Sequence, residues 1–263
     1  MKNNPVKQTL KAGGTVFGSE ISRLRSNDIP RIYASAGFDF VFIDMEHTCF
    51  SQETVADLIQ TARACDIVPL VRVPEAEYVW VARALDAGAQ GIIVPRVNTA
   101  EQVQQIVSWT RYPPQGIRGF ACNTAQTDGH TIDIEDHIES ANQGLLVVIQ
   151  IERREAVVNL SEMLSIEGVD VACLGLMDLT VDLGIPGQLK HPSTVTAVQR
   201  LMDIARKNGV ASGVISACQD TIADSMAQGV RFVSYATDEI LLQRASNQAV
   251  QKLRSVCQEL PVP

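Results

Sequence analysis

The chain has 263 residues, of which 46% are hydrophobic and 20% are charged, a composition typical of a globular protein. Its formal net charge is −8, which does not favour nucleic acid as a partner, and no apolar run approaches the ~20 residues needed to cross a bilayer. The six cysteines are scattered without a CxxC pair, so we expect a reduced, cytoplasmic protein that binds neither nucleic acid nor membrane.

Apolar, β-branched runs alternate with helix-like segments along the whole chain. Most of these runs are continuously apolar, as expected for parallel strands that are covered on both faces. The expected strands are Thr15–Ser19, Phe40–Asp44, Val68–Val73, Gly91–Pro95, Leu145–Glu152, Val169–Gly175, Ala211–Ser216 and Arg231–Thr237. The expected helices are Pro30–Ala36, Ser51–Ala64, Tyr78–Ala87, Thr99–Thr110, Asp133–Asn142, Glu155–Leu164, Ser193–Asn208, Asp220–Gln228 and Glu239–Glu259.

The alternation of strands and helices predicts the fold class. Strand–helix units that fill ~250 residues indicate an α/β protein with one closed (β/α)8 TIM barrel spanning residues 1–263. A doubly wound open sheet is the main alternative. That fold usually carries a glycine-rich phosphate loop after an early strand, and neither GxGxxG nor GxxxxGK[ST] is present. The longest interruption, residues 111–144, is a candidate functional loop.

Polar side chains follow the second expected strand in the segment Ile43–His47. His47 falls just beyond the carboxyl end of that strand, where an imidazole can act as a base. Asp44 precedes it by three residues and is close enough in sequence to orient the ring. The alternative is a loop histidine without a role.

Arg72 lies within the third expected strand, which is otherwise apolar. A buried guanidinium needs an anion at the strand end, because an unpaired buried charge is costly. A structural ion pair is the alternative to a role in substrate binding.

Glu152 ends one expected strand and Asp178 closely follows the next, 26 positions later, about one strand–helix–strand unit. Both are therefore expected at the carboxyl ends of neighbouring strands, where barrels build their sites. Two hard oxygen ligands without Cys or His beside them suit Mg²⁺ or Mn²⁺. The alternatives are N-caps of the following helices or surface acids.

Two covalent mechanisms receive no support. A Schiff base needs a desolvated lysine on a strand, and no lysine lies in an expected strand. A nucleophilic serine of the G-x-S-x-G type is also absent.

Several ordered motifs together resemble the HpcH/HpaI aldolases, metal-dependent pyruvate aldolases that include the 2,4-dihydroxyhept-2-ene-1,7-dioate and 2-keto-3-deoxy-sugar-acid aldolases. The likeness runs from about Gly14 to Leu242. It rests on Ala36–Asp39, Ile43–His47, Val71–Pro74, Leu85–Gly91, Tyr112–Gly119, Gln150–Glu152, Glu167–Asp170 and Asp178–Thr180.

The resemblance implies a barrel of the phosphoenolpyruvate/pyruvate type and a cleavable bond between pyruvate and an aldehyde, in the catabolism of aromatic compounds or sugar acids. It implies a divalent metal (Mg²⁺, Mn²⁺ or Co²⁺) and a homohexamer built from dimers that exchange a C-terminal helix, for which Glu239–Glu259 is the candidate. The resemblance implies that Glu152 and Asp178 bind the metal and that Gln150, Asp178 and the backbone of Met177 bind pyruvate. It implies that Arg72 stabilises the enolate. It also implies that His47 transfers the proton, with help from Asp44 or Asp86. Asp86 is expected at the amino end of its own barrel and would reach His47 from a neighbouring subunit.

The chain departs from the family pattern in three segments. Leu176 stands where a proline is usual, residues 121–125 replace an Ala-Arg-Ala-like segment, and Ala236–Asp238 replaces a Gly-Ser-Asp-like turn. The second change removes an expected cation from the loop that would shape the aldehyde pocket. The alternatives to an aldolase are an oxaloacetate decarboxylase or related carbon–carbon lyase, and a barrel that serves as a scaffold without catalysis.

Overall fold

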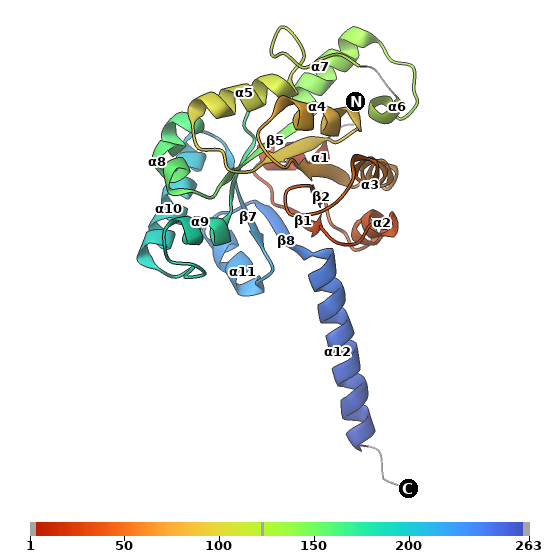
Figure 1. Cartoon of the computed structure of the whole chain (residues 1–263), viewed down its shortest axis with the longest axis vertical. Coiled ribbons are helices and arrows are strands. Elements are labelled where there is room, and N and C mark those ends of the chain that lie inside the picture. The colour runs from red at the N-terminus through yellow and green to blue at the C-terminus, as the bar shows by residue number, and fades with distance from the viewer. Residues whose placement is uncertain (1–3, 122–123, 260–263) are drawn as a thin grey trace.

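The computed structural model describes residues 4–121 and 124–259. Parallel strands pair in chain order, and the last returns to pair with the first, which closes the barrel (Figure 1). The predicted (β/α)8 barrel is therefore confirmed. The strands are β1 (Val16–Ile21), β2 (Phe40–Asp44), β3 (Val68–Arg72), β4 (Gly91–Val94), β5 (Leu146–Ile151), β6 (Val171–Leu174), β7 (Ala211–Ser216) and β8 (Phe232–Thr237).

The helices surround the barrel, and every predicted strand and helix is present with ends that differ by at most two residues. Three helices were not predicted, namely α1, α6 and α9. The helices are α1 (Pro5–Lys11), α2 (Asp28–Ser35), α3 (Gln52–Ala64), α4 (Tyr78–Asp86), α5 (Ala100–Thr110), α6 (Thr124–Thr127), α7 (Ile134–Gly144), α8 (Arg154–Met163), α9 (Leu176–Asp182), α10 (Pro192–Lys207), α11 (Gln219–Ala227) and α12 (Asp238–Glu259).

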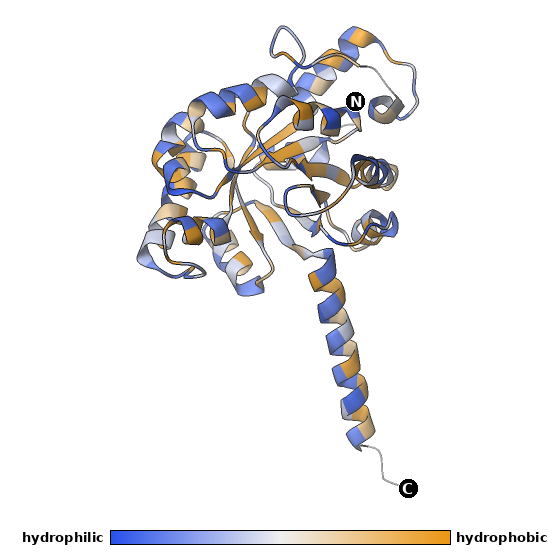
Figure 2. Cartoon of the chain, in the orientation of Figure 1, coloured by the Kyte–Doolittle hydropathy of each residue, from blue (hydrophilic) through white to orange (hydrophobic). Residues whose placement is uncertain are grey.

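The strands are apolar on both faces because one face fills the barrel and the other packs against the helices. Figure 2 shows the strands as mainly hydrophobic, whereas the outer helices alternate between hydrophobic and hydrophilic residues. The interior contains buried side chains such as Phe40, Phe42 and Phe232, and the rings of Phe40 and Phe232 stack with centroids 4.5 Å apart. The Cys173 thiol lies in this interior, and the described cysteines form no disulfide.

Helix α1 lies at the amino end of the barrel. Its N-cap is Asn4, whose side chain accepts a hydrogen bond from the Lys7 amide, and Pro5 occupies the first turn. The Lys7 ammonium donates to the Leu145 carbonyl (2.6 Å) and to Asp170 (3.0 Å), which precede β5 and β6. This lysine is therefore at the end of the barrel opposite to the predicted site.

The uppermost interior layer at the carboxyl end consists of Glu20, Arg72, Gln150 and Ile215. These residues lie at one level because the strands are staggered around the barrel. The residue in register with one member two strands further on lies two positions before the next member. The pairs on this path are Arg72–Ile93–Val148, Gln150–Cys173–Gly213, Ile215–Ser234–Gly18 and Glu20–Phe42–Leu70. Barrels build such layers from alternate strands. Here three of the four side chains are polar, so the layer forms the floor of a polar mouth.

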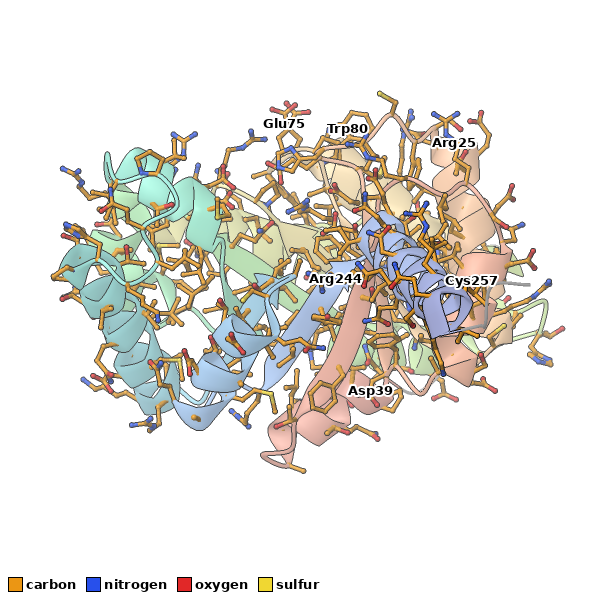
Figure 3. The ribbon with its side chains drawn as sticks, turned by 90° about the horizontal axis from the view of Figure 1, so that it is seen from below. Arg25, Asp39, Glu75, Trp80, Arg244 and Cys257 are labelled. Atoms are coloured by element: carbon orange, nitrogen blue, oxygen red, sulfur yellow. The ribbon has the colours of Figure 1, made fainter. Side chains whose placement is uncertain are left out.

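Helix α12 extends away from the barrel instead of covering it (Figure 1). Only its first turns are anchored, because Leu241 packs against the core and Arg244 donates to the Tyr235 hydroxyl (2.6 Å) and the Ala217 carbonyl (2.7 Å). Figure 3 looks along this helix, which comes toward the viewer from Arg244 to Cys257. None of the helices in the described part of the chain combines the length and apolarity that crossing a membrane requires.

Candidate functional site

Asp44 and Arg72 form the central ion pair of the barrel mouth. The two residues are paired in register on β2 and β3, and Arg72 Nε donates to Asp44 Oδ1 at 2.7 Å. Burial alone would lower the pKa of Arg72, but this hydrogen bond and the surrounding carboxylates raise it above its ordinary value. Asp44 is fully buried, so the guanidinium remains charged and fixed at the end of β3.

Asp44 holds the backbone of His47 rather than its imidazole. Its carboxylate accepts hydrogen bonds from the amide of Glu46 (2.9 Å) and from the amide of His47 (3.2 Å). The carboxylate that faces the imidazole within this chain is Glu46, at 3.7 Å from Nε2. The imidazole itself is 61% exposed at the rim, where it can meet a substrate.

Glu46 is a functional candidate that the sequence analysis did not single out. Its side chain is only 7% exposed and faces two guanidinium groups, Arg72 Nε and Arg96 Nη2, each at 3.4 Å. Burial raises the pKa of Glu46, and the positive charges of Arg72, His47 and Arg96 oppose this shift. Its place within the segment Ile43–His47 was the available signal in the sequence. Its burial, however, depends on arginines from β3 and from the turn after β4.

Glu152 is placed directly after β5 and is buried. Its Oε1 accepts a hydrogen bond from the Arg96 amide at 2.6 Å, and Arg96 adopts a left-handed backbone conformation with φ of 54°. Gln150, two residues earlier, is also buried. Its Nε2 lies 3.4 Å from Glu152 Oε2, and its Oε1 has no partner among the described residues. The mouth therefore contains an amide oxygen that can accept a further hydrogen bond.

Asp178 lies three residues beyond the predicted strand, in the first turn of the unpredicted helix α9. Strand β6 stops at Leu174, and Gly175 is the N-cap of the short helix. A Cβ on Gly175 would lie 2.6 Å from Glu152 Oε2, so a glycine is required where Glu152 packs against this turn. Met177 is also in the first turn, where backbone amides have no intrahelical partner, and its side chain is 60% exposed.

The two acids fit a hard divalent cation. Burial raises the pKa of Glu152 to about 7, the hydrogen bond from Arg96 opposes the shift, and the charges of Glu46 and Asp178 add to it. A cation would offset this accumulation of negative charge. Across residues 4–121 and 124–259, no group of three or more His, Cys, Asp and Glu side chains is placed to hold a metal.

Asp86 lies outside this cluster, at the last residue of α4. Its carboxylate accepts hydrogen bonds from Arg118 Nη2 (3.0 Å) and Gln126 Nε2 (3.1 Å). It also lines a groove of about 380 Å³ between α3 and α4, together with Met45 and Trp80. No contact between Asp86 and His47 is formed among the described residues of one chain. Residues 122 and 123, in the segment that departs from the family pattern, lie outside the described residues.

Glu20 is a second acid that the sequence analysis missed. It points into the mouth from β1, and its Oε1 lies 3.9 Å from Arg72 Nη2, too far for a hydrogen bond. Burial raises the pKa of Glu20 to about 7, the charge of Arg72 opposes the shift, and neighbouring carboxylates add to it. The predicted strand ended at Ser19, one residue short of this side chain.

The raised pKa of Glu20 predicts a pH-dependent stability. Between its ordinary value of 4.5 and about 7 the unfolded chain loses this proton before the folded chain does, so the free energy of unfolding falls as pH rises. The Glu20→Gln variant lacks this titrating group. We therefore expect its free energy of unfolding, relative to that of the wild type, to increase by about 2 to 3 kcal/mol as the pH rises from about 5 to about 8.5. Urea unfolding of the chelator-treated proteins measures this difference. A difference that stays constant with pH would contradict the assignment.

The comparisons with known proteins point to one family. A family profile described as HpcH/HpaI aldolase/citrate lyase matches residues 22–245. The 4-hydroxy-2-oxo-heptane-1,7-dioate aldolase of Shigella sonnei is 35% identical over 243 residues, which cover 92% of each chain. The hydroxypyruvate/pyruvate aldolase of Roseobacter denitrificans is 33% identical over 91% of this chain and 93% of its own.

A solved structure extends the likeness to three dimensions. The crystal structure of an HpcH/HpaI aldolase from Desulfitobacterium hafniense superposes with a TM-score of 0.89 at 30% identity, covering 97% of both chains. The family profile and the relatives each cover most of the barrel, including the elements that carry Asp44, Arg72 and Glu152. The chain therefore belongs to the HpcH/HpaI aldolase/citrate lyase family and is an enzyme of the lyase class.

Proposed function

We propose that this enzyme catalyses the reversible, metal-dependent aldol addition of pyruvate to an aldehyde, which gives or cleaves a 4-hydroxy-2-oxo acid. The observation that supports this most strongly is the composition of the mouth. The fixed guanidinium of Arg72 and the side-chain amide of Gln150 share the uppermost interior layer, and two carboxylates that suit a divalent cation accompany them. This set matches a small anionic keto acid that must be deprotonated.

Glu152 and Asp178 would hold the cation, which we propose to be Mg²⁺, Mn²⁺ or Co²⁺. When bound, it would polarise the keto oxygen of pyruvate and so make the methyl group easier to deprotonate. Gln150 and the free amide of Met177 are the groups that would hold pyruvate. Arg72 has no hydrogen bond from its terminal nitrogens to any described residue, so these remain available for the enolate oxygen.

His47 is the candidate for taking the methyl proton, because its imidazole is exposed at the rim beside Glu46. The enolate carbon then attacks the aldehyde carbon, and the resulting alkoxide takes up a proton. Asp44 would act on His47 through the backbone it holds. A role for Asp86 at the imidazole requires a neighbouring copy of the chain, since its own barrel keeps it bonded to Arg118.

The test is a search for product with pyruvate, a panel of aldehydes and each of the three metals. We expect a 4-hydroxy-2-oxo acid to accumulate with at least one aldehyde, and the product to disappear when the metal is chelated. If oxaloacetate is decarboxylated while no aldehyde gives any product, the enzyme is a decarboxylase that uses the same enolate.

We further propose that α12 is exchanged between two copies of the chain. The outer face of β1 and β8 carries an apolar groove of about 420 Å³, which Phe17, Val233 and Met226 help to line. In a complete barrel the last helix would cover this face, but α12 leaves the barrel (Figure 1). Its exposed apolar side chains form a stripe at helical spacing, made of Leu242, Val250, Leu253 and Val256. In a dimer, the apolar stripe on α12 of each copy would pack in the groove of the other copy.

A charge in this stripe tests the exchange. We expect Leu253→Asp to dissociate the oligomer, because the carboxylate would be buried without a partner at the interface. The matched control is Gln251→Asp, which adds the same charge on the opposite side of the helix. Sedimentation velocity of both variants measures the outcome, and an intact oligomer in the Leu253 variant would contradict the proposal.

A further inference from the structure

Glu20 is an acid in the floor of the mouth that the proposed reaction leaves without a role. It shares the uppermost interior layer with Arg72 and Gln150, both of which the reaction uses. Its side chain is only 10% exposed. Asp44 beside it accepts three hydrogen bonds, whereas the Glu20 carboxyl accepts none from any described residue.

This arrangement is unfavourable for folding. A carboxyl group that is largely removed from water and lacks donors costs free energy, and the guanidinium at 3.9 Å is already bonded to Asp44. Neither oxygen of Glu20 is fully enclosed, so its remaining exposure reaches the space of the mouth. A bound molecule that carries hydrogen-bond donors would satisfy this carboxyl group.

On the opposite side of the layer, Gln150 Oε1 also lacks a hydrogen-bond donor, since it is buried without a partner among the described residues. The floor therefore offers two acceptors that lack donors. Pyruvate has no hydroxyl group and cannot supply one. Among the two substrates of the proposed reaction, an aldehyde with at least one hydroxyl group is the one that can supply a donor.

The charge of the mouth further limits which aldehydes can serve as the second substrate. The mouth contains two guanidinium groups, those of Arg72 and Arg96, and a larger number of acidic side chains, which are Glu20, Asp44, Glu46, Glu152 and Asp178. Even with a divalent cation bound, the ionised carboxylate of Glu20 would repel an additional carboxylate on the aldehyde. An uncharged acceptor avoids this repulsion.

Building on the proposed aldolase function, we propose that Glu20 determines specificity by accepting a hydrogen bond from a hydroxyl group of the acceptor aldehyde. The enzyme then selects uncharged hydroxyaldehydes, such as glyceraldehyde or glycolaldehyde. It discriminates against aldehydes of equal size that lack the hydroxyl group and against acceptors that carry a carboxylate.

The test compares ratios of kcat/KM for the metal-loaded enzyme with pyruvate in excess. At about pH 8.5, where the Glu20 carboxylate is ionised, the wild type is expected to use glyceraldehyde at least about tenfold better than propanal, the size expected for one hydrogen bond to a charged group. Glu20→Leu removes the acceptor at similar volume, and its ratio should fall to about one. Glu20→Gln keeps an acceptor oxygen without the charge, so it should retain part of the preference and use succinic semialdehyde several-fold better than the wild type does.

Ile215→Val is the matched control, because it alters the same layer without changing any hydrogen bond, and its glyceraldehyde-to-propanal ratio should remain that of the wild type. Circular dichroism establishes that each variant is folded, and the Gln variant decides the question if the Leu variant does not fold. A wild type without the preference, or a folded Glu20 variant that keeps it in full, overturns the assignment. Absence of pyruvate proton exchange in the wild type would instead remove the aldolase function and this inference with it.

Discussion

Glu152→Ala is expected to abolish turnover, with a loss of at least about a thousandfold in kcat/KM. Glu152 is the buried one of the two proposed metal ligands, and the Arg96 amide and Gly175 fix its carboxylate beside α9. With only two protein ligands, removal of either leaves one carboxylate, so metal affinity should fall together with activity. Calorimetric titration with Mn²⁺ and a pyruvate assay on the same preparation measure both quantities.

Asp178→Ala should give the same double loss, since the two residues act on one cation. The matched control is Glu155→Ala, an exposed glutamate in the first turn of α8 with no contact to the mouth. It should bind metal and turn over as the wild type does. Tight metal binding by the Glu152 variant would show that the cation is held elsewhere.

Arg72→Ala is expected to separate metal binding from chemistry. The variant should still bind the divalent metal, because Arg72 is not a ligand, but enolate formation should slow by about a hundredfold to a thousandfold. The physical reason is that the guanidinium would supply a fixed positive charge to the enolate oxygen in addition to that of the metal. The measurements are metal titration and the rate of pyruvate proton exchange.

The same variant should also lose stability. Arg72 compensates three acids, Glu20, Asp44 and Glu46, and its removal leaves them mutually repulsive in a buried site, at a cost of about 3 to 5 kcal/mol near neutral pH. Arg206→Ala, which removes an exposed arginine on α10, is the control and should change stability little. An Arg72→Ala enzyme that exchanges pyruvate protons at the wild-type rate would remove this residue from the mechanism.

The fold was predictable because its strands are covered on both sides. Continuous apolar runs such as Phe40–Asp44 and Ala211–Ser216 coincide with β2 and β7. The helix starts at Ser51 and Thr99 are also confirmed, since both side chains cap their helices and Thr99 forms a capping box with Gln102. These signals are local, so the sequence alone carries them.

The site was only partly predictable because its charges meet across strands. Arg72 was identified since a charge in an apolar strand is conspicuous, whereas Glu20 follows the apolar run and reads as its end. Glu46 reads as a loop acid, and its burial depends on arginines contributed by β3 and the turn after β4. Arg96 acts on Glu152 through its backbone, which a residue type does not reveal.

Two expectations changed for a physical reason that concerns the backbone. Asp44 was expected at the imidazole, but nearby backbone amides and the Arg72 guanidinium occupy its oxygens. Asp178 was expected just beyond the strand that ends at Gly175, and it lies there in a short helix that was not predicted. Both differences arise because short turns after a strand rearrange polar groups within a few residues.

The most direct test of the central claim is the exchange of pyruvate methyl protons in deuterated water without any aldehyde. We expect no exchange in protein stripped by a chelator, and exchange that returns when Mg²⁺ or Mn²⁺ is added to the wild type but not to the Glu152→Ala variant. Undiminished exchange in the stripped protein, or exchange restored equally in that variant, would contradict the claim that Glu152 and Asp178 hold the cation that activates pyruvate.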